Sequence, residues 1–204
     1  MQIINCEQRS EEWRNARLAI PSSSRFKEIV TSKGDPSKSR TAYLYELAGE
    51  RLTGVRKERH KSKAMEDGTE REQMSRWIYS MDNEVVVEEV GFCLSDCSRW
   101  GASPDGLVGN DGLLELKNPE VQTQLKRLHE KSSIVSMGYY QQCQGQLFVT
   151  ERNWNDFGSY YPGLLPYIIR IEPDHEFLIK LERELIAFCE ELDEICAEKE
   201  RKWG

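Results

Sequence analysis

This chain of 204 residues contains only three histidines, and its six cysteines form no Cys-x-x-Cys pair and have no histidine nearby in the sequence. Zinc and iron–sulfur sites need clusters of Cys and His, so this pattern argues against both kinds of site. A reduced, cytoplasmic protein fits this cysteine usage best.

Long apolar segments are also missing. The longest apolar stretches fall far short of the ~20 residues that a membrane-spanning helix needs, so we expect no membrane partner. Residues 1–6 lack the basic start and the apolar core of a secretion signal. No internal repeat or low-complexity segment interrupts the chain, and 38% of its residues are hydrophobic, so we expect one compact domain over residues 1–204.

Positive charge is scarce overall, because the net charge is −7, but it is unevenly distributed. Between Glu172 and Glu200 there are eleven acidic and three basic residues, a local charge of −8, so the rest of the chain sums to +1. Within that remainder, Arg51–Lys63 holds six Lys or Arg and one Glu. The sequence therefore predicts a basic segment where a nucleic-acid backbone could enter, although a solvated loop has the same composition.

One glycine-rich segment near the middle of the chain carries residues with catalytic chemistry. Leu113–Lys117 has the length and apolarity of a short buried strand, on which side chains two residues apart share a face. Glu115 and Lys117 are then neighbours, with leucines on the opposite face. Gly109–Gly112 has the composition of a hairpin turn, and a hairpin folded there brings Asp105 beside Glu115.

Asp105 and Glu115 would form a pair of converging carboxylates, which raises the pKa of one of them unless a cation lies between them. Mg²⁺ is the simplest candidate, because it prefers oxygen ligands and is usually held by one or two carboxylates. Lys117 would then stabilise the charge of a phosphate transition state or orient the attacking water. Such residues also occur together by chance in charged chains, but the Ser-Pro-Asp-Gly sequence at Ser103–Gly106 favours a metal-dependent nuclease.

Four segments in a shared order resemble the PD-(D/E)xK nuclease superfamily, and within it the family of phage lambda exonuclease and the YqaJ-like viral recombinases. They are an Arg-x-x-x-Trp opening within Gln8–Ser24, a Gly-x-x-x-Glu motif at Gly68–Glu72, the Asp and Glu-x-Lys core, and a Tyr-x-x-Gln-x-Gln element at Tyr139–Gln144. The resemblance implies an α/β fold with a restriction-endonuclease-like core, in which helices flank a central mixed β-sheet.

The same resemblance implies a site with two Mg²⁺ ions, for which Mn²⁺ is an alternative. The oxygen atoms implied as metal ligands come from Asp105, Glu115, the main-chain carbonyl of Leu116 and, directly or through water, Glu72. Lys117 and Gln142 would position the nucleophilic water.

Other matching positions concern the DNA. Arg17, Ser24 and Ser103 correspond to residues that bind the 5′-terminal phosphate of duplex DNA in lambda-type enzymes. Met65 corresponds to an apolar residue that separates the two strands. Ala19 departs from the family's pattern, which has a glycine at this position.

Several of these positions have competitors or simpler explanations. Glu70 lies close to Glu72 in a helix of mixed charge, and only the family position favours Glu72. Gln142 and Gln146 are one helical turn apart and could form a solvated helix edge, although amides that point inward would need partners. Arg17 and the serines near it could be ordinary surface and capping residues.

The implied function is a metal-dependent 5′→3′ exonuclease that digests one strand of linear double-stranded DNA to 5′-mononucleotides and leaves 3′ single-stranded tails for recombination. Relatives of this kind are homotrimeric rings that work with a single-strand annealing protein, so we expect both partners and a phage or prophage origin. Two alternatives are a restriction- or repair-type endonuclease of the same superfamily and a non-catalytic DNA-binding module on a decayed nuclease fold.

Apolar patterning predicts the elements that position these residues. Helices are expected within residues 10–50, most strongly at Arg40–Leu52, at Glu66–Met81, around Gln142, and as a long amphipathic helix at the C-terminus. Strands are expected at Val85–Cys93, Ser98–Ala102, Leu113–Lys117, Asp156–Tyr161 and Tyr167–Ile171.

Overall fold

A five-stranded β-sheet forms the centre of the computed structural model, which describes the backbone of residues 1–56 and 63–203 and the side chains of residues 1–56 and 70–198. The strands lie in the order β2-β5-β6-β7-β8. Their bounds are β2 Val87–Glu88, β5 Gly106–Val108, β6 Gly112–Lys117, β7 Trp154–Ser159 and β8 Tyr167–Ile171. Strands β6 and β7 are parallel and the other neighbours are antiparallel, so the expected mixed sheet is confirmed.

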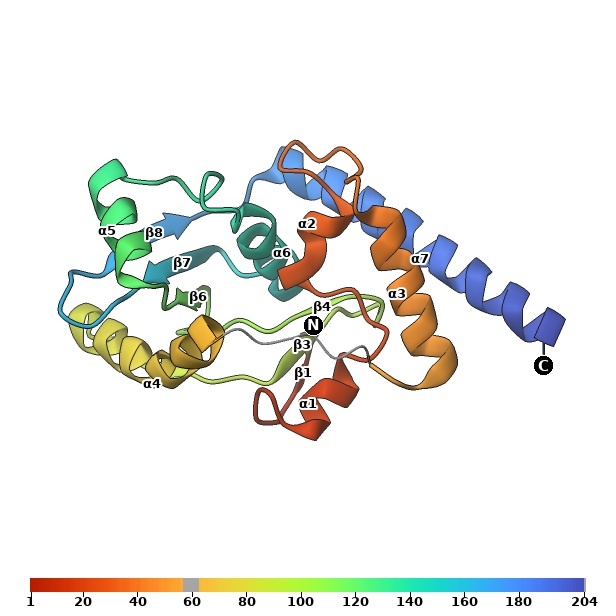
Figure 1. Ribbon diagram of the computed structural model, residues 1–204, viewed down its shortest axis with the longest axis horizontal. Helices are drawn as coiled ribbons and strands as arrows, with labels where there is room; N and C mark the ends of the chain where they lie inside the picture. The colour runs from red at the N-terminus through yellow and green to blue at the C-terminus, as the bar shows by residue number, and fades with distance from the viewer. Residues whose placement is uncertain (57–62, 204) are drawn as a thin grey trace.

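Helices flank this sheet on both sides, as Figure 1 shows. Helix α4 (Lys63–Asn83) lies on one side, and α5 (Val121–Glu130) and α6 (Tyr140–Thr150) lie on the other. Helices α5 and α6 make the crossover between β6 and β7, because two parallel strands cannot be joined by a tight turn. The α/β fold with flanking helices is therefore as the sequence predicted.

The N-terminal part builds a second, antiparallel sheet and a group of short helices. The sheet has the order β1-β3-β4, with β1 Gln2–Ile4, β3 Phe92–Leu94 and β4 Gly101–Ala102. The helices are α1 Glu11–Ala16, the 3-10 helix η1 Ser23–Arg25, α2 Phe26–Ile29 and α3 Arg40–Thr53. An isolated parallel bridge joins Ser22 to Gly101, so the segment before η1 lies beside β4.

The expected strand Val85–Cys93 is wrong as a single element. It divides into β2 and β3, which belong to different sheets. Gly91 lies at the division, where an added Cβ would approach the main-chain oxygens of Ile4 and Cys6 to 2.5 Å. Only a residue without a side chain allows two segments of main chain to come this close, so the chain changes sheets here.

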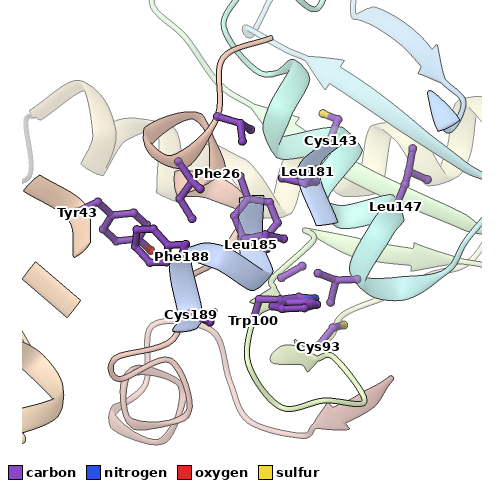
Figure 2. Packing of buried hydrophobic residues seen from close by; sticks show 14 of the residues in the cluster. Phe26, Tyr43, Cys93, Trp100, Cys143, Leu147, Leu181, Leu185, Phe188 and Cys189 are labelled. Carbon is purple, nitrogen blue, oxygen red and sulfur yellow. The ribbon is translucent and has the colours of Figure 1, made fainter. Parts of the chain in front are cut away.

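The C-terminal helix α7 (His175–Trp203) packs along α3 and contributes much of the hydrophobic core, part of which is shown in Figure 2. The fully buried apolar residues on α7 are Leu181, Leu185, Phe188 and Leu192. The ring of Phe188 contacts Tyr43 of α3 at a centroid distance of 5.5 Å. The expected amphipathic stripe is confirmed, and it packs on the domain core.

Within the described residues, no helix is both long enough and apolar enough to cross a lipid bilayer. That the whole chain folds as one domain stays a prediction.

Candidate active site

The hairpin of β5 and β6 brings the two central carboxylates together. Its strands pair antiparallel, with Gly106 opposite Leu114, and the turn lies at Gly109 as expected. Asp105 directly precedes β5, and its N–H donates to the Leu114 oxygen at 2.9 Å. Oδ2 of Asp105 accepts from the N–H of Leu116 at 2.6 Å, so the side chain lies against the strand that carries Glu115.

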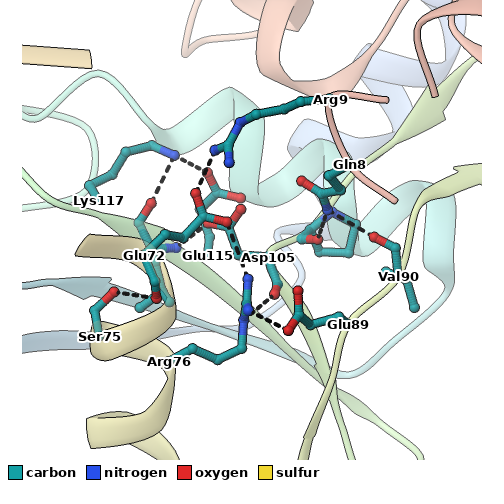
Figure 3. Close-up of polar contacts among 12 residues, drawn as sticks. Gln8, Arg9, Glu72, Ser75, Arg76, Glu89, Val90, Asp105, Glu115 and Lys117 are labelled. Atoms are coloured by element: carbon teal, nitrogen blue, oxygen red, sulfur yellow. Dashed lines mark hydrogen bonds and ion pairs between the residues drawn. The ribbon is translucent and has the colours of Figure 1, made fainter. Parts of the chain in front are cut away.

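The two faces of β6 have the alternation that the sequence predicted. Leu114 and Leu116 pack with Tyr79 of α4 in a small apolar cluster. Glu115 and Lys117 point to the opposite face, where Lys117 forms an ion pair with Glu115, as Figure 3 shows. Period-two alternation therefore separates the core contacts of this strand from its polar residues.

Glu115 is the centre of the polar group, although its side chain is only 1% exposed. Oε1 accepts from Lys117 and from Nε2 of Gln142 at 2.6 Å. Oε2 accepts from Nε2 of Gln146 at 2.5 Å. Gln142 and Gln146 of α6 therefore point inward to the sheet and have partners, and the solvated helix edge is wrong for these two residues. Gln146 was not among the expected site residues, although its spacing from Gln142 was a visible signal.

Lys117 is held as a cation by its surroundings. Its ammonium also donates to the main-chain oxygen of Leu116 at 3.1 Å, so that this carbonyl faces the site. Burial by itself lowers the pKa of Lys117, but the charges of Glu115 and Asp105 outweigh it and raise the pKa above its ordinary value. A charged lysine stabilises negative charge and donates hydrogen bonds, and it does not act as a base.

Glu72 reaches the site from α4. Its carboxylate accepts from Arg9 at 2.5 Å and from Arg76 at 3.2 Å. Nε of Arg76 also donates to the main-chain oxygen of Asp105 at 3.0 Å, which ties α4 to the Asp105 segment. Glu70 is exposed, so the tertiary structure selects Glu72 over its competitor.

The charge state of Asp105 reflects this crowding. Burial, followed by the charge of Glu115, raises the pKa of Asp105 to about 8, with Glu72 adding to the shift and Lys117 opposing it. A carboxylate that ionises reluctantly beside two others is a place where a cation removes repulsion.

The donor set suits a hard divalent cation. The carboxylates of Glu115 and Glu72 lie close enough to Asp105 to raise its pKa, and the Leu116 carbonyl adjoins this group. Oxygen ligands of this kind are those that Mg²⁺ and Mn²⁺ prefer. In the described part of the chain, no three Asp, Glu, His or Cys side chains are arranged closely enough to hold a metal ion without some movement.

We expect the metal-free protein to lose stability as the pH rises from about 4 to about 8. The pKa of Asp105 is about 8 in the folded protein and near the ordinary 3.8 in the unfolded chain, so only the folded state keeps this proton in that interval. The free energy of unfolding then falls by up to ~1.4 kcal/mol per pH unit, and Asp105→Asn removes that slope. Urea unfolding in EDTA between about pH 5 and 8 measures the free energy of unfolding of the wild type and of Asp105→Asn. The same dependence on pH in the two proteins would contradict the raised pKa.

A second polar pocket surrounds the buried guanidinium of Arg17, at the end of α1. Nη2 of Arg17 donates to Ser22 at 2.9 Å and to Ser24 at 3.4 Å, and Nη1 donates to Ser103 at 3.3 Å. Cζ lies 4.1 Å from the ring centroid of Trp13. The structure thus brings Arg17, Ser24 and Ser103 together as expected and adds Ser22, which the bridge to Gly101 places there.

The pocket carries positive charge, and one of its hydrogen-bond donors has no partner among the described residues. Nε of Arg17 is buried and has no hydrogen-bond partner among the described residues. Burial, and then the charge of Arg56, lower the pKa of Arg17 to about 10, which still leaves it charged at neutral pH. Arg56 lies 5.8 Å from the Trp13 ring, so the described end of the basic segment reaches this pocket. Three hydroxyls and a buried cation form a suitable site for a phosphate anion.

One position departs from the family's pattern, and two further expectations concern residues outside the described part of the chain. Ala19, which stands in place of the family's glycine, keeps a left-handed backbone with φ of 56°, a conformation that is strained for alanine. Met65 falls in the first turn of α4, where its side chain lies outside the described residues. The stretch 57–62 of the basic segment also lies outside them.

Comparisons with known proteins concern the family and the fold. Residues 12–153 match the YqaJ-like viral recombinase domain. Among curated proteins, none matches the chain significantly.

Solved structures of exonucleases are similar over nearly the whole chain. An alkaline exonuclease from Laribacter hongkongensis is 35% identical, with a TM-score of 0.85 over 95% of this chain and 97% of that one. The complex of that enzyme with dAMP gives 35% identity and a TM-score of 0.83 over 94% and 97% of the two chains. A phage-related exonuclease from Haemophilus somnus 129PT, at 13% identity and a TM-score of 0.64 over 97% of each chain, shares the fold alone.

Proposed function

This chain belongs to the YqaJ-like viral recombinase family, and from that premise we propose that it is a Mg²⁺-dependent 5′→3′ exonuclease. It would digest one strand of linear double-stranded DNA to 5′-mononucleotides and leave a 3′ single-stranded tail for recombination. A nuclease is supported by the family and by 35% identity to an alkaline exonuclease over 95% of the chain. The metal, the direction and the recombination role are proposals.

The observation that carries this proposal is the meeting of Asp105, Glu115 and Lys117 at one end of β6. Asp105, Glu115 and the Leu116 carbonyl would hold the metal, with Glu72 completing the site directly or through water. Bound Mg²⁺ lowers the pKa of a water molecule and stabilises charge on phosphate oxygens. The proposed arrangement would be that of a PD-(D/E)xK nuclease, and the same oxygen donors would accept two ions, or Mn²⁺ in place of Mg²⁺.

Lys117 and Gln142 would act on the substrate side of these carboxylates. The ammonium of Lys117 would move from Glu115 toward the scissile phosphate as the carboxylates take up the metal charge, and would stabilise the negative charge of the transition state. Gln142, which contacts the same oxygen of Glu115 as Lys117 does, would help to orient the attacking water.

Dependence on a DNA end would come from the pocket of Arg17. A 5′-terminal phosphate is a dianion that internal phosphates of a duplex cannot imitate, and Arg17 with Ser22, Ser24 and Ser103 offers charge-assisted hydrogen bonds to it. The unpartnered Nε of Arg17 supports an anion at this place. A Met65 wedge between the two strands remains part of the proposal.

Arg17→Ala tests this end-binding role. Each charge-assisted hydrogen bond contributes about 1.5–3 kcal/mol, so we expect the wild-type preference for 5′-phosphate over 5′-hydroxyl ends to fall about tenfold or more. The measurement is the ratio of the two digestion rates at fixed salt, because contacts to the DNA backbone vary steeply with ionic strength. Arg14→Ala, an exposed arginine of the same helix, is the matched control and should keep the wild-type ratio. An unchanged ratio in Arg17→Ala would remove the phosphate pocket from the proposal.

The rival activity is that of an endonuclease with the same metal chemistry. Incubation with linear and covalently closed circular DNA separates the two, because an end-dependent enzyme leaves closed circles intact. A non-catalytic DNA-binding module would hydrolyse neither substrate.

We further propose the assembly and setting that the family suggests. The chain would form a homotrimeric ring around duplex DNA and act with a single-strand annealing protein in the cytoplasm of a bacterial host, as a phage or prophage gene product. A closed ring would explain processive digestion without recognition of sequence. The molar mass in solution, measured by light scattering, tests the trimer.

A further inference from the structure

Gln146 connects Glu115 to a second fully buried amide, Asn155 of β7. Oε1 of Gln146 accepts from Nδ2 of Asn155 at 2.7 Å, while its Nε2 donates to Glu115. Nδ2 of Asn155 also lies 3.5 Å from the main-chain oxygen of Cys143 in α6. A chain of hydrogen bonds therefore runs from the main chain of α6 through two side chains to the carboxylate.

This chain of hydrogen bonds has one consistent direction. The Cys143 carbonyl lies at one end, and the Glu115 carboxylate, which is paired with Lys117, lies at the other; both accept hydrogen bonds. If the Asn155 amide were turned over, its oxygen would face the Cys143 carbonyl. Gln146 would then have to donate to Asn155, and its own oxygen would repel Glu115. The orientation of Asn155 therefore sets which end of Gln146 meets the site.

The presence of Asn155 at this position lowers the stability of the fold. Its Oδ1 is buried without a hydrogen-bond partner among the described residues, and a buried polar atom of this kind destabilises the fold. An apolar side chain at this position of β7 would avoid the penalty. A role of the amide in orienting Gln146 explains why a polar residue lies here.

A neighbouring glutamine shows what a purely structural amide in α6 does. Gln144 is 2% exposed, and both ends of its amide contact the main chain before α7, at Glu172 and Asp174. Gln146 has similar burial and the same number of side-chain hydrogen bonds, but one of them goes to Glu115. The two residues differ in their connection to the site.

We propose that Gln146, oriented by Asn155, is a positioning residue that fixes the carboxylate of Glu115 for cation binding. Gln142 and Lys117 hold Oε1 and Gln146 holds Oε2, so the carboxylate cannot rotate without breaking hydrogen bonds. A ligand that is already fixed loses little conformational freedom when it binds a cation. This inference rests on the proposed function, because it takes Glu115 as a metal ligand.

The test is the affinity of the full chain for Mg²⁺ alone, measured by calorimetry without DNA. Gln146→Met removes the amide and keeps the length and volume of the side chain, and it should weaken Mg²⁺ binding by ~10-fold or more. Asn155→Leu should weaken it in the same direction, because leucine keeps nearly the shape of asparagine but cannot donate to Gln146. The double variant should bind no more weakly than the worse single variant, since both act through one chain of hydrogen bonds. Gln144→Met is the matched control and should keep wild-type Mg²⁺ affinity even where it lowers Tm.

The outcomes separate this inference from the proposed function. Wild-type affinity in both Gln146→Met and Asn155→Leu, or equal weakening in Gln144→Met, overturns the positioning role. Mg²⁺-dependent hydrolysis by the wild type then leaves the proposed function standing. A wild-type protein that neither binds Mg²⁺ nor uses it for hydrolysis overturns both. Should Gln146→Met fail to fold, Asn155→Leu, which is nearly unchanged in shape and buries no charge, decides by the same criteria.

Discussion

Asp105→Asn is expected to abolish the proposed Mg²⁺-dependent hydrolysis of linear duplex DNA, with a loss of ~10³-fold or more in rate. The substitution removes a ligand charge that no main-chain group can replace, yet an asparagine oxygen can still accept from the N–H of Leu116. Glu115→Gln should lose as much activity, because it removes the carboxylate at the centre of the polar group. Both rates are measured with 5′-phosphorylated linear DNA across a range of Mg²⁺ concentrations.

Folding of these variants is the control. Asp105→Asn removes a carboxylate whose pKa is raised by burial and by Glu115, so in EDTA it should melt no lower than the wild type. Glu115→Gln removes the ion-pair partner of the half-buried Lys117 and should be the less stable of the two. Near-normal turnover in a folded variant of either kind would end the assignment of this site.

Lys117→Ala should reduce the rate of hydrolysis by ~10²-fold or more while the protein still binds Mg²⁺ and DNA. The lysine is a cation beside the carboxylates that we propose as metal ligands, so its removal should cost transition-state stabilisation rather than a ligand. Single-turnover rates at saturating Mg²⁺ measure the chemical step, and calorimetry measures Mg²⁺ affinity.

Lys126→Ala is the matched control, because Lys126 is 68% exposed on α5 and should tolerate the change with no effect on the chemical step. Loss of Mg²⁺ binding or of the folded state in Lys117→Ala would make the lysine structural.

Local patterns in the sequence were sufficient to predict how the residues at the centre of the site are arranged. Alternation along Leu113–Lys117 predicted the two faces of β6, and the composition of Gly109–Gly112 predicted the hairpin that brings Asp105 beside Glu115. These features depend on residues that are close in the chain, where strand geometry and turn chemistry determine position. The apolar spacing of α7 predicted its buried stripe for the same reason.

Some expectations failed where the chain meets a distant segment. The strand expected at Val85–Cys93 divides at Gly91 because the main chain of Ile4 and Cys6 passes close to it, and the glycine by itself does not show which distant segment approaches. Strands as short as β1 and β5 give too little periodicity to be recognised.

The sequence by itself determined the mixed α/β fold, the order of the motifs and the strand that carries Glu115 and Lys117. Only the tertiary structure turned Gln146 inward and placed Ser22 beside Arg17, and it supports the choice of Glu72 over Glu70 that the family resemblance had already made. Those choices depend on which faces of α4, α6 and the segment before η1 meet the sheets. Contacts between residues far apart in the chain are decided by the packing of whole elements, and the periodicity of a single element does not contain them.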